Sequence, residues 1–201
     1  MLLYSMPSSG NSYKVRLLLA LLGQAVERVD VEDSSPAIAQ AKAEDRLPFG
    51  KAPVLELDDG RLLPESNAIL CWLGQGTDFV PADPFLNATM LGWMFWEQNQ
   101  HEAVIAVRGA LRFYPRRAHL ATPERMAELL DRGHDLLQIM ENRLARHDWL
   151  VGETVSLADI CLYGYTHTAE ERGGFDMARF AGINRWIQRI QALPGYKGLD
   201  A

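Results

Sequence analysis

The sequence predicts a protein of two parts: an α/β domain with βαβ–ββα order, followed by an all-helical domain. Short apolar or alternating segments typical of strands occur only before residue 65, and an Asp-Gly turn separates the last two of them. Beyond residue 82 only helical spacing remains. With 201 residues and 48% hydrophobic content, the chain can bury a substantial core.

The first four elements predict a βαβ unit. Residues 2–4 form a short apolar strand, and residues 13–23 have helical spacing that ends on a glycine suited to a helix C-terminus. Residues 26–31 (VERVDV) alternate as a second strand, and an Ala-rich helix covers residues 35–44. A strand joined to the next through a helix pairs with it in parallel, so we expect strands one and two to be parallel.

The next stretch, PVLELDDGRLLP at residues 53–64, predicts an antiparallel hairpin around Asp58–Asp59–Gly60. A helix then follows over residues 65–74 (ESNAILCWLG). The complete βαβ–ββα order is that of thioredoxin-like domains. We therefore assign such a domain to residues 1–76.

Residues 77–82 lose periodicity and predict a linker, after which helix-start signals recur through the all-helical domain of residues 83–201. Asp83–Pro84 and Thr122–Pro123 each place a capping residue before a helix-starting proline. Ser156 and Asp159 have the spacing of a capping box at the start of a later helix.

Charge and cysteine content limit the classes of partner. The formal net charge is −6 and neither half of the chain is basic, so we expect no nucleic acid or anionic membrane as a partner. Cys71 and Cys161 lie far apart without ligand spacing, which predicts neither a disulfide nor a metal site. No apolar run reaches the length of a membrane span, and no secretion signal precedes the first strand. We expect a cytoplasmic protein with reduced thiols.

Six segments, taken in order, resemble one enzyme family: SSGNSYKVRLLLALLG, FGKAPVLELDDG, PESNAILCWLG, VPADP, GETVSLADICLYGYTH and RWIQRIQALPGY. Over nearly its full length the chain resembles the soluble glutathione S-transferases, in particular the bacterial branches with a serine at the catalytic position. The resemblance implies glutathione as co-substrate, no metal, a homodimer, and a helical domain that lines the electrophile pocket.

The resemblance places the catalytic residues in the turn before the first helix. Glutathione reacts as the thiolate, but a thiol with a pKa of about 8.5 is mostly protonated at pH 7. A hydroxyl donor and a helix N-terminus both favour the anion. Ser9 matches the activating serine, and Asn11 falls where another bacterial branch has a sulfur-contacting asparagine. The alternative is that Ser8 or Ser12 caps the helix and Ser9 is only a turn residue.

Five further residues match positions that hold the tripeptide. Pro53 matches the family's cis-proline, and Val54 would pair its backbone with the cysteinyl unit like an added strand. Glu65 and Ser66 match the pair that binds the γ-glutamyl ammonium and carboxylate, and Lys51 matches a contact to the glycyl carboxylate. The alternative for Pro53 is a trans proline at a strand start. Glu65 and Ser66 could be ordinary residues of a helix N-terminus, and Lys51 a solvated lysine.

The resemblance also suggests roles for an aromatic residue and for the first long helix of the helical domain. Phe49 corresponds to an aromatic key that some classes insert into the partner subunit; the alternative is a local core aromatic. His101 and Arg108 fall on the helix that lines the electrophile pocket. For His101, the alternative is a structural role. For the arginines at i,i+4 spacing, Arg108, Arg112 and Arg116, the alternative is a solvated or ion-paired helix face.

The function predicted is that of a glutathione transferase, in which Ser9 stabilises the thiolate that attacks a small apolar electrophile. One alternative is glutathione-dependent reduction of peroxides or disulfides. Ser12 occupies a place where related sequences often carry cysteine, so redox chemistry through a cysteine of this turn is not expected. The other alternative is a non-catalytic interaction module with the same fold. An activating residue together with the glutathione anchors favours the enzyme.

Overall fold

The computed structural model describes residues 1–201, which form two compact units. The N-terminal unit comprises residues 1–80 and 191–201, and the helical unit comprises residues 81–190. The chain therefore leaves the N-terminal unit once and returns to it with its last residues. The domain boundaries at 76 and 83 stay predictions.

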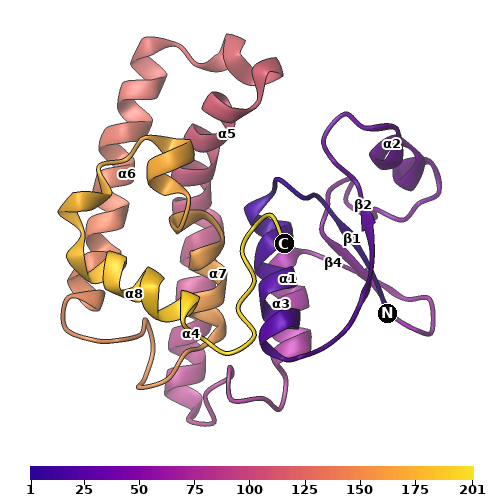
Figure 1. The fold of residues 1–201 in the computed structure, drawn as a ribbon, viewed down its shortest axis with the longest axis horizontal. Helices are drawn as coiled ribbons and strands as arrows, with labels where there is room; N and C mark the ends of the chain where they lie inside the picture. The colour runs from indigo at the N-terminus through magenta and orange to yellow at the C-terminus, as the bar shows by residue number, and fades with distance from the viewer. The chain divides into compact units, whose positions relative to one another are not determined.

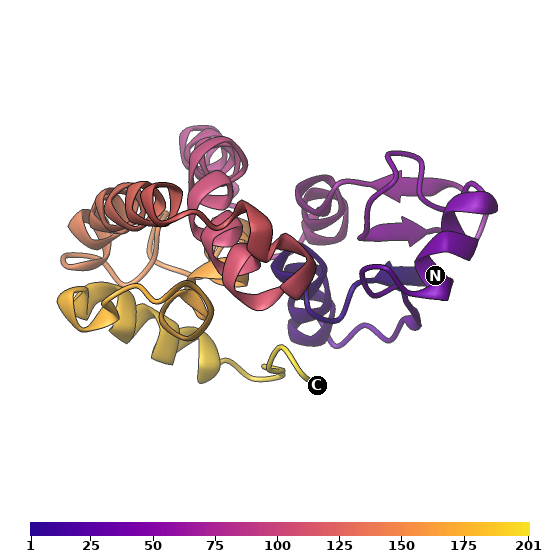
Figure 2. The ribbon, with the colours of Figure 1, turned by 90° about the horizontal axis from the view of Figure 1, so that it is seen from above.

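The N-terminal unit is a four-stranded sheet with three helices (Figures 1 and 2). Its elements are β1 (Leu2–Ser5), α1 (Gly10–Leu21), β2 (Glu27–Asp30), α2 (Pro36–Ala43), β3 (Val54–Glu56), β4 (Leu62–Pro64) and α3 (Ser66–Gly74). The strand order is β2-β1-β3-β4. As predicted, β1 and β2 are parallel and β3 and β4 are antiparallel. The thioredoxin-like prediction is confirmed.

Both faces of this sheet are covered. Helices α1 and α3 lie side by side on one face, and α2 lies on the other (Figure 1). Tyr4, Val31 and Val54 pack with residues of α2 and the following loop. Burial of such side chains stabilises a fold by about 1.5–3 kcal/mol each. The buried sheet thereby fixes the end of β1 and the start of β3, where the predicted site residues lie.

Helix α1 begins three residues earlier than predicted, at Gly10. Gly10, Asn11 and Ser12 are weak helix formers, which is why the periodicity alone starts the helix later. Two side-chain contacts support the early start. Ser9 is the N-cap and accepts from the Ser12 N–H, and the Ser12 hydroxyl accepts from the Met6 N–H at 2.9 Å.

The helical unit contains no strand. Its elements are α4 (Pro84–Trp96), η1 (Glu97–Ala106), α5 (Val107–Phe113), η2 (Pro115–Leu120), α6 (Pro123–Leu144), α7 (Leu157–Thr166), η3 (Ala169–Gly173), η4 (Met177–Arg179) and α8 (Ala181–Gln191). Asp83 and Thr122 cap α4 and α6, as predicted. Helices α4 and α5 continue one another through the π-helical η1 (Figure 1). No helix of the protein combines the length and apolar character needed to cross a bilayer.

The predicted capping box at the start of α7 is present and forms the polar centre of the helical unit. The buried Asp159 carboxylate accepts bonds from Leu150 N at 3.0 Å, from the N–H and hydroxyl of Ser156 at 2.9 Å, and from Trp186 Nε1 at 2.9 Å. Burial raises the pKa of Asp159, and these bonds oppose that shift. One side chain thus joins α7 to α8 and to the preceding loop.

Candidate functional site

The three serines around the start of α1, Ser8, Ser9 and Ser12, have different hydrogen-bond partners. Ser8 donates its hydroxyl to Glu32 Oε1 at 2.7 Å and its N–H to Oε2 at 3.1 Å. Ser12 is fully buried. Ser9 is only partly buried; its Oγ accepts from Ser12 N at 3.5 Å, and its own hydroxyl proton has no acceptor in the chain. Ser9 is therefore the serine of this turn whose proton is available to a ligand.

The capping alternative for this turn named Ser8 or Ser12, whereas the structure places the cap at Ser9. At 3.5 Å the capping bond is long. A serine oxygen can accept one bond while its proton is donated elsewhere. Capping and donation to a thiolate are thus compatible at Ser9.

The N-terminal ends of α1 and α3 are joined by a side-chain hydrogen bond. Ser66 Oγ donates to Asn11 Oδ1 at 3.0 Å, which links the first turns of the two helices that lie side by side in Figure 1. The N-cap of α3 is Glu65, and its side chain makes no capping bond. Unpaired N–H groups at a helix start favour anions. This arrangement suits a carboxylate at the start of α3.

Glu65 adopts a backbone conformation that non-glycine residues rarely have, with φ at +71°. A residue held in such a conformation costs about 1–3 kcal/mol. Its side chain is exposed and has no partner in the chain. An exposed carboxylate without a partner therefore lies at the N-cap of α3.

The backbone at Pro53 agrees with the resemblance, because the Ala52–Pro53 peptide bond is cis. Val54 opens β3 and lies in register with Tyr4 of β1 and Pro64 of β4, so the sheet occupies both of its sides. Ala52 lies outside the strands, and neither its N–H nor its C=O is hydrogen-bonded within the chain. The open backbone is therefore at Ala52, which the sequence analysis missed, rather than at Val54.

Two family models match the chain: the glutathione S-transferase N-terminal domain over residues 3–78 and the C-terminal domain over residues 103–194. The crystal structure of a glutathione S-transferase from Pseudomonas fluorescens is 41% identical, covers 98% of each chain and superposes with a TM-score of 0.92. This chain belongs to the glutathione S-transferase family. The predictions of this family and of a glutathione S-transferase enzyme are confirmed, and the serine-type branch stays a prediction.

Other relatives of this glutathione S-transferase have names that refer to different activities. Glutathione S-transferase 3 of Zea mays is 30% identical over 97% of this chain and 90% of its own. The disulfide-bond oxidoreductase YfcG of Escherichia coli is 27% identical over 65% of this chain and 59% of its own. The relatives of this chain therefore include a protein named for transfer and a protein named for disulfide chemistry.

Two further predicted residues of this transferase lie on the surface of the N-terminal unit. Phe49 is 64% exposed, so its interpretation as a local core aromatic is wrong. Lys51 is exposed and forms no ion pair. Both side chains are free to contact a ligand or a second subunit.

The two residues predicted to line the electrophile pocket are buried in the helical unit. His101 Nε2 lies 3.0 Å from Thr166 Oγ1. Arg108 donates Nε to the carbonyl of Gly173 at 2.7 Å and Nη1 to the carbonyl of Met126. The contacts of Arg108 hold α5, η3 and α6 together, and the contact of His101 joins η1 to α7. A role in the pocket stays a prediction for both residues.

Arg16 of the transferase connects the turn before α1 to the last residues of the chain, a link that sequence spacing cannot reveal. Its guanidinium donates to Ser5 Oγ at 2.7 Å, to the Pro7 carbonyl at 3.1 Å and to the Leu199 carbonyl at 2.9 Å. Burial lowers its pKa, and the charge of Arg28 adds to this. Arg16 therefore fixes the backbone immediately before Ser8 and Ser9.

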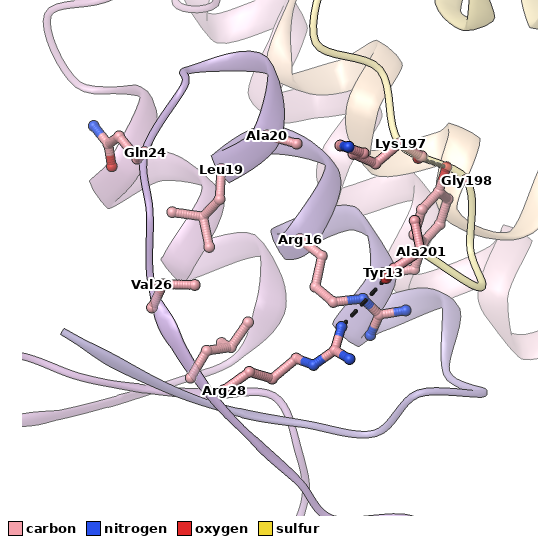
Figure 3. Close-up of a pocket in the computed structure, with 11 residues that line it drawn as sticks. Tyr13, Arg16, Leu19, Ala20, Gln24, Val26, Arg28, Lys197, Gly198 and Ala201 are labelled. Atoms are coloured by element: carbon pink, nitrogen blue, oxygen red, sulfur yellow. Dashed lines mark hydrogen bonds between the residues drawn. The ribbon is translucent and has the colours of Figure 1, made fainter.

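A cavity of about 340 Å³ lies beside this contact, between α1, β2 and the last residues (Figure 3). Its lining includes Leu3, Arg16, Arg28 and Lys197. None of the predicted glutathione-binding residues lines it. It is thus separate from the candidate glutathione site.

Proposed function

We propose that this glutathione S-transferase stabilises the glutathione thiolate with Ser9 and transfers the glutathionyl group to a small, largely apolar electrophile. The observation that carries the proposal is the unengaged Ser9 hydroxyl proton at the N-terminus of α1. The thiol proton leaves to solvent, the sulfur attacks an electrophilic carbon, and a C–S bond replaces the bond to the leaving group. Titration of the bound thiol by ultraviolet absorbance, together with an electrophile panel, tests it.

Asn11 supports the same step as a second donor. Its Oδ1 accepts from Ser66, so the Nδ2 group of the planar amide is directed to a different side. Two donors and the positive end of α1 all favour the charged form of the sulfur. A module that only bound glutathione would retain it without lowering the thiol pKa, so the titration separates this alternative from the enzyme.

The remaining groups would hold the tripeptide. The open start of α3 and Ser66 suit the γ-glutamyl carboxylate, and the unpaired Glu65 carboxylate suits its ammonium group. The free backbone N–H and C=O of Ala52 suit antiparallel pairing with the cysteinyl unit, a role that we now assign to Ala52 in place of Val54. The exposed Lys51 suits the glycyl carboxylate.

Glu65→Ala and Ser66→Ala are expected to raise the KM for glutathione about ten- to a hundredfold and to lower kcat less. Each change removes a charge-assisted bond, which contributes on the order of 1.5–3 kcal/mol, at a distance from the reacting sulfur. Steady-state kinetics with glutathione as the varied substrate measures this. Glu27→Ala, which removes an exposed carboxylate in β2, is the matched control. If both variants keep the wild-type KM, Glu65 and Ser66 do not bind the γ-glutamyl end of glutathione.

We also propose a homodimer that uses exposed apolar side chains on both units. The N-terminal unit exposes Phe49 and Trp72, the latter at 44%, and the helical unit exposes Phe85 at 77% and Phe95 at 65%. In a two-fold symmetric dimer, an interface residue is buried once in each of the two subunits.

Phe49→Ser is expected to shift the protein toward monomer in analytical ultracentrifugation, with an unchanged circular dichroism spectrum. Burial of one phenylalanine contributes about 1.5–3 kcal/mol, and a two-fold interface loses two. Because Phe49 is 64% exposed in the single chain, its removal leaves the unit's own core intact. A dimer constant equal to that of the wild type would show that Phe49 lies outside the interface.

Disulfide reduction is the second candidate activity, and the similarity to the oxidoreductase YfcG favours it. The glutathione thiolate attacks one sulfur of a disulfide, and a second glutathione releases the first as glutathione disulfide, so two thiols are oxidised for each disulfide reduced. If the enzyme reduces hydroxyethyl disulfide but conjugates no electrophile, its activity is disulfide reduction and not glutathionyl transfer. Neither Cys71 nor Cys161 is in a disulfide, which supports a cytoplasmic location.

A further inference from the structure

Glu32 lies just after β2, at the sheet edge where β1 also ends. Strands β1 and β2 are parallel, so their carboxyl ends lie at the same edge. Their pairing extends one residue beyond β2, because the buried Val31 donates its N–H to the Ser5 carbonyl at 2.8 Å. Ser5 is the last residue of β1, and the turn that carries Ser9 follows it. The two strands therefore place Glu32 beside that turn.

The Glu32 carboxylate accepts both a side-chain and a backbone hydrogen bond from Ser8. Its Oε1 accepts from the Ser8 hydroxyl at 2.7 Å, and its Oε2 accepts from the Ser8 N–H at 3.1 Å. Oε1 also accepts from the Asp33 N–H at 2.8 Å. Hydrogen bonds to a carboxylate are roughly twice as strong as those between neutral groups. Because both bonds go to one residue, they fix the position of Ser8 as well as its orientation.

The carbonyl groups of the same turn are bound by Arg16 of α1. The guanidinium donates to the Met6 carbonyl at 3.5 Å and to the Pro7 carbonyl at 3.1 Å. Within the turn, the Ser9 N–H donates to the Met6 carbonyl at 3.0 Å. Together with the bonds of Ser8, these contacts fix three successive residues on the N-terminal side of Ser9.

The Ser9 side chain is held only weakly by its own contacts. Its Oγ accepts from the Ser12 N–H at 3.5 Å, which is long for a hydrogen bond. A donor stabilises an anion most strongly when it is in position before the charge develops. A displacement of about 1 Å can lower a rate about a hundredfold. The position of the Ser9 hydroxyl therefore depends on the backbone that Ser8 fixes.

We infer that Glu32 is a positioning residue of the transferase: it holds Ser8, and through Ser8 it sets the position from which the Ser9 hydroxyl donates to the sulfur of glutathione. Both Glu32 oxygens are engaged by donors of Ser8 and Asp33, so its effect is on geometry and it transfers no proton. The inference rests on the proposed function, because it needs Ser9 to be the donor.

Glu32→Ala is expected to lower kcat about tenfold and to raise the pKa of the bound thiol, with less than about a threefold change in the KM for glutathione. Steady-state kinetics and an ultraviolet titration of the glutathione complex measure these effects. The loss falls on kcat because the groups proposed to hold the tripeptide are untouched. Wild-type values of kcat and thiol pKa overturn the inference, and so does a loss that falls on KM alone.

Glu56→Ala is the matched control. Glu56 is, like Glu32, a partly buried acid that accepts a hydroxyl bond, in its case from Tyr4 at 3.2 Å. It lies in register with Leu2, at the opposite end of β1 from the turn. The control should keep wild-type kcat and thiol pKa. If it lowers kcat as much as Glu32→Ala does, the effect is not specific to the turn and the inference is overturned.

Glu32→Gln is a milder variant that keeps the shape of the side chain. A carboxamide has one acceptor end and one donor end, so in either orientation its NH₂ group faces an N–H, that of Ser8 or that of Asp33. The other contacts are retained. We therefore expect kcat between those of the wild type and Glu32→Ala. If Glu32→Gln is as slow as Glu32→Ala, the charge of Glu32 is responsible rather than its bonds to Ser8, and the inference is overturned.

A double-mutant cycle with Ser9→Ala tests whether Glu32 acts through Ser9. If it does, adding Glu32→Ala to Ser9→Ala lowers kcat less than about twofold further, because the hydroxyl that Glu32 positions is already gone. Losses that multiply overturn the inference. A slow Ser9→Ala beside a wild-type Glu32→Ala rejects the positioning role and leaves the proposed function intact. Wild-type activity in Ser9→Ala rejects the proposed role of Ser9, and the inference with it.

Discussion

Ser9→Ala is expected to lower kcat/KM for glutathione conjugation roughly ten- to a thousandfold and to raise the pKa of the bound thiol. Loss of one preorganised donor to an anion costs on the order of 2–4 kcal/mol. No neighbouring serine can replace it, because the Ser8 hydroxyl is bonded to Glu32 and Ser12 is fully buried. Steady-state kinetics and an ultraviolet titration of the glutathione complex measure the two effects.

The control for Ser9→Ala has to account for the capping role that the structure gives this residue. The capping bond of 3.5 Å is long, so we expect the free energy of unfolding to fall by no more than about 1 kcal/mol. Ser35 caps α2 through Ile38 N at 3.2 Å, and Ser35→Ala therefore matches the cap loss without touching the site. It should keep wild-type activity and thiol pKa.

Two outcomes would contradict the assignment of Ser9. If Ser9→Ala keeps wild-type activity and thiol pKa while Asn11→Ala loses both, the activating donor is the asparagine amide. If neither change matters, the positive end of α1 and its backbone N–H groups suffice to stabilise the anion.

Asp159→Ala is expected to lower the free energy of unfolding by about 4 kcal/mol or more. It leaves buried donors of Leu150, Ser156 and Trp186 without an acceptor, and each unsatisfied group costs about 1–3 kcal/mol. Urea denaturation followed by tryptophan fluorescence measures the change. A loss of this size is a large part of the total stability of an ordinary domain.

Asp148→Ala is the matched control for Asp159→Ala. Asp148 is paired with Arg189 on the surface, where its side chain is 70% exposed, so its loss should change stability by less than about 1 kcal/mol. Equal denaturation midpoints for the two variants would show that the contacts of Asp159 contribute little to folding.

The order of elements could be predicted because it depends on local signals. The Asp-Gly turn at residues 59–60 marks the hairpin, and Asp83 and Thr122 before prolines mark two helix starts. The periodicity missed the start of α1, because Gly10, Asn11 and Ser12 are weak helix formers, and the bond from Ser66 of α3 to Asn11 leaves no local signal. The periodicity of a sequence carries no information on contacts between elements that are far apart in the chain.

The candidate site likewise combines residues that the sequence can name with features that depend on the folded chain. Residue types and their order are sufficient to name Ser9, Pro53 and Ser66 from a resemblance. The open backbone of Ala52 and the positive φ of Glu65 depend on the conformation of the chain, which residue types alone do not specify. The link from Arg16 to Leu199 joins residues at opposite ends of the sequence.

That link also bears on the order in which the protein is completed during synthesis. Tyr13 donates to the Lys197 carbonyl at 2.8 Å and Arg16 to that of Leu199, so the N-terminal unit needs residues that are synthesised after the helical unit. Domains generally fold as units, the N-terminal one first. Here the earliest-made unit reaches its final packing only after the helical unit has been synthesised. On a nascent chain, the turn that carries Ser9 therefore lacks this support until residues 197–199 have been synthesised.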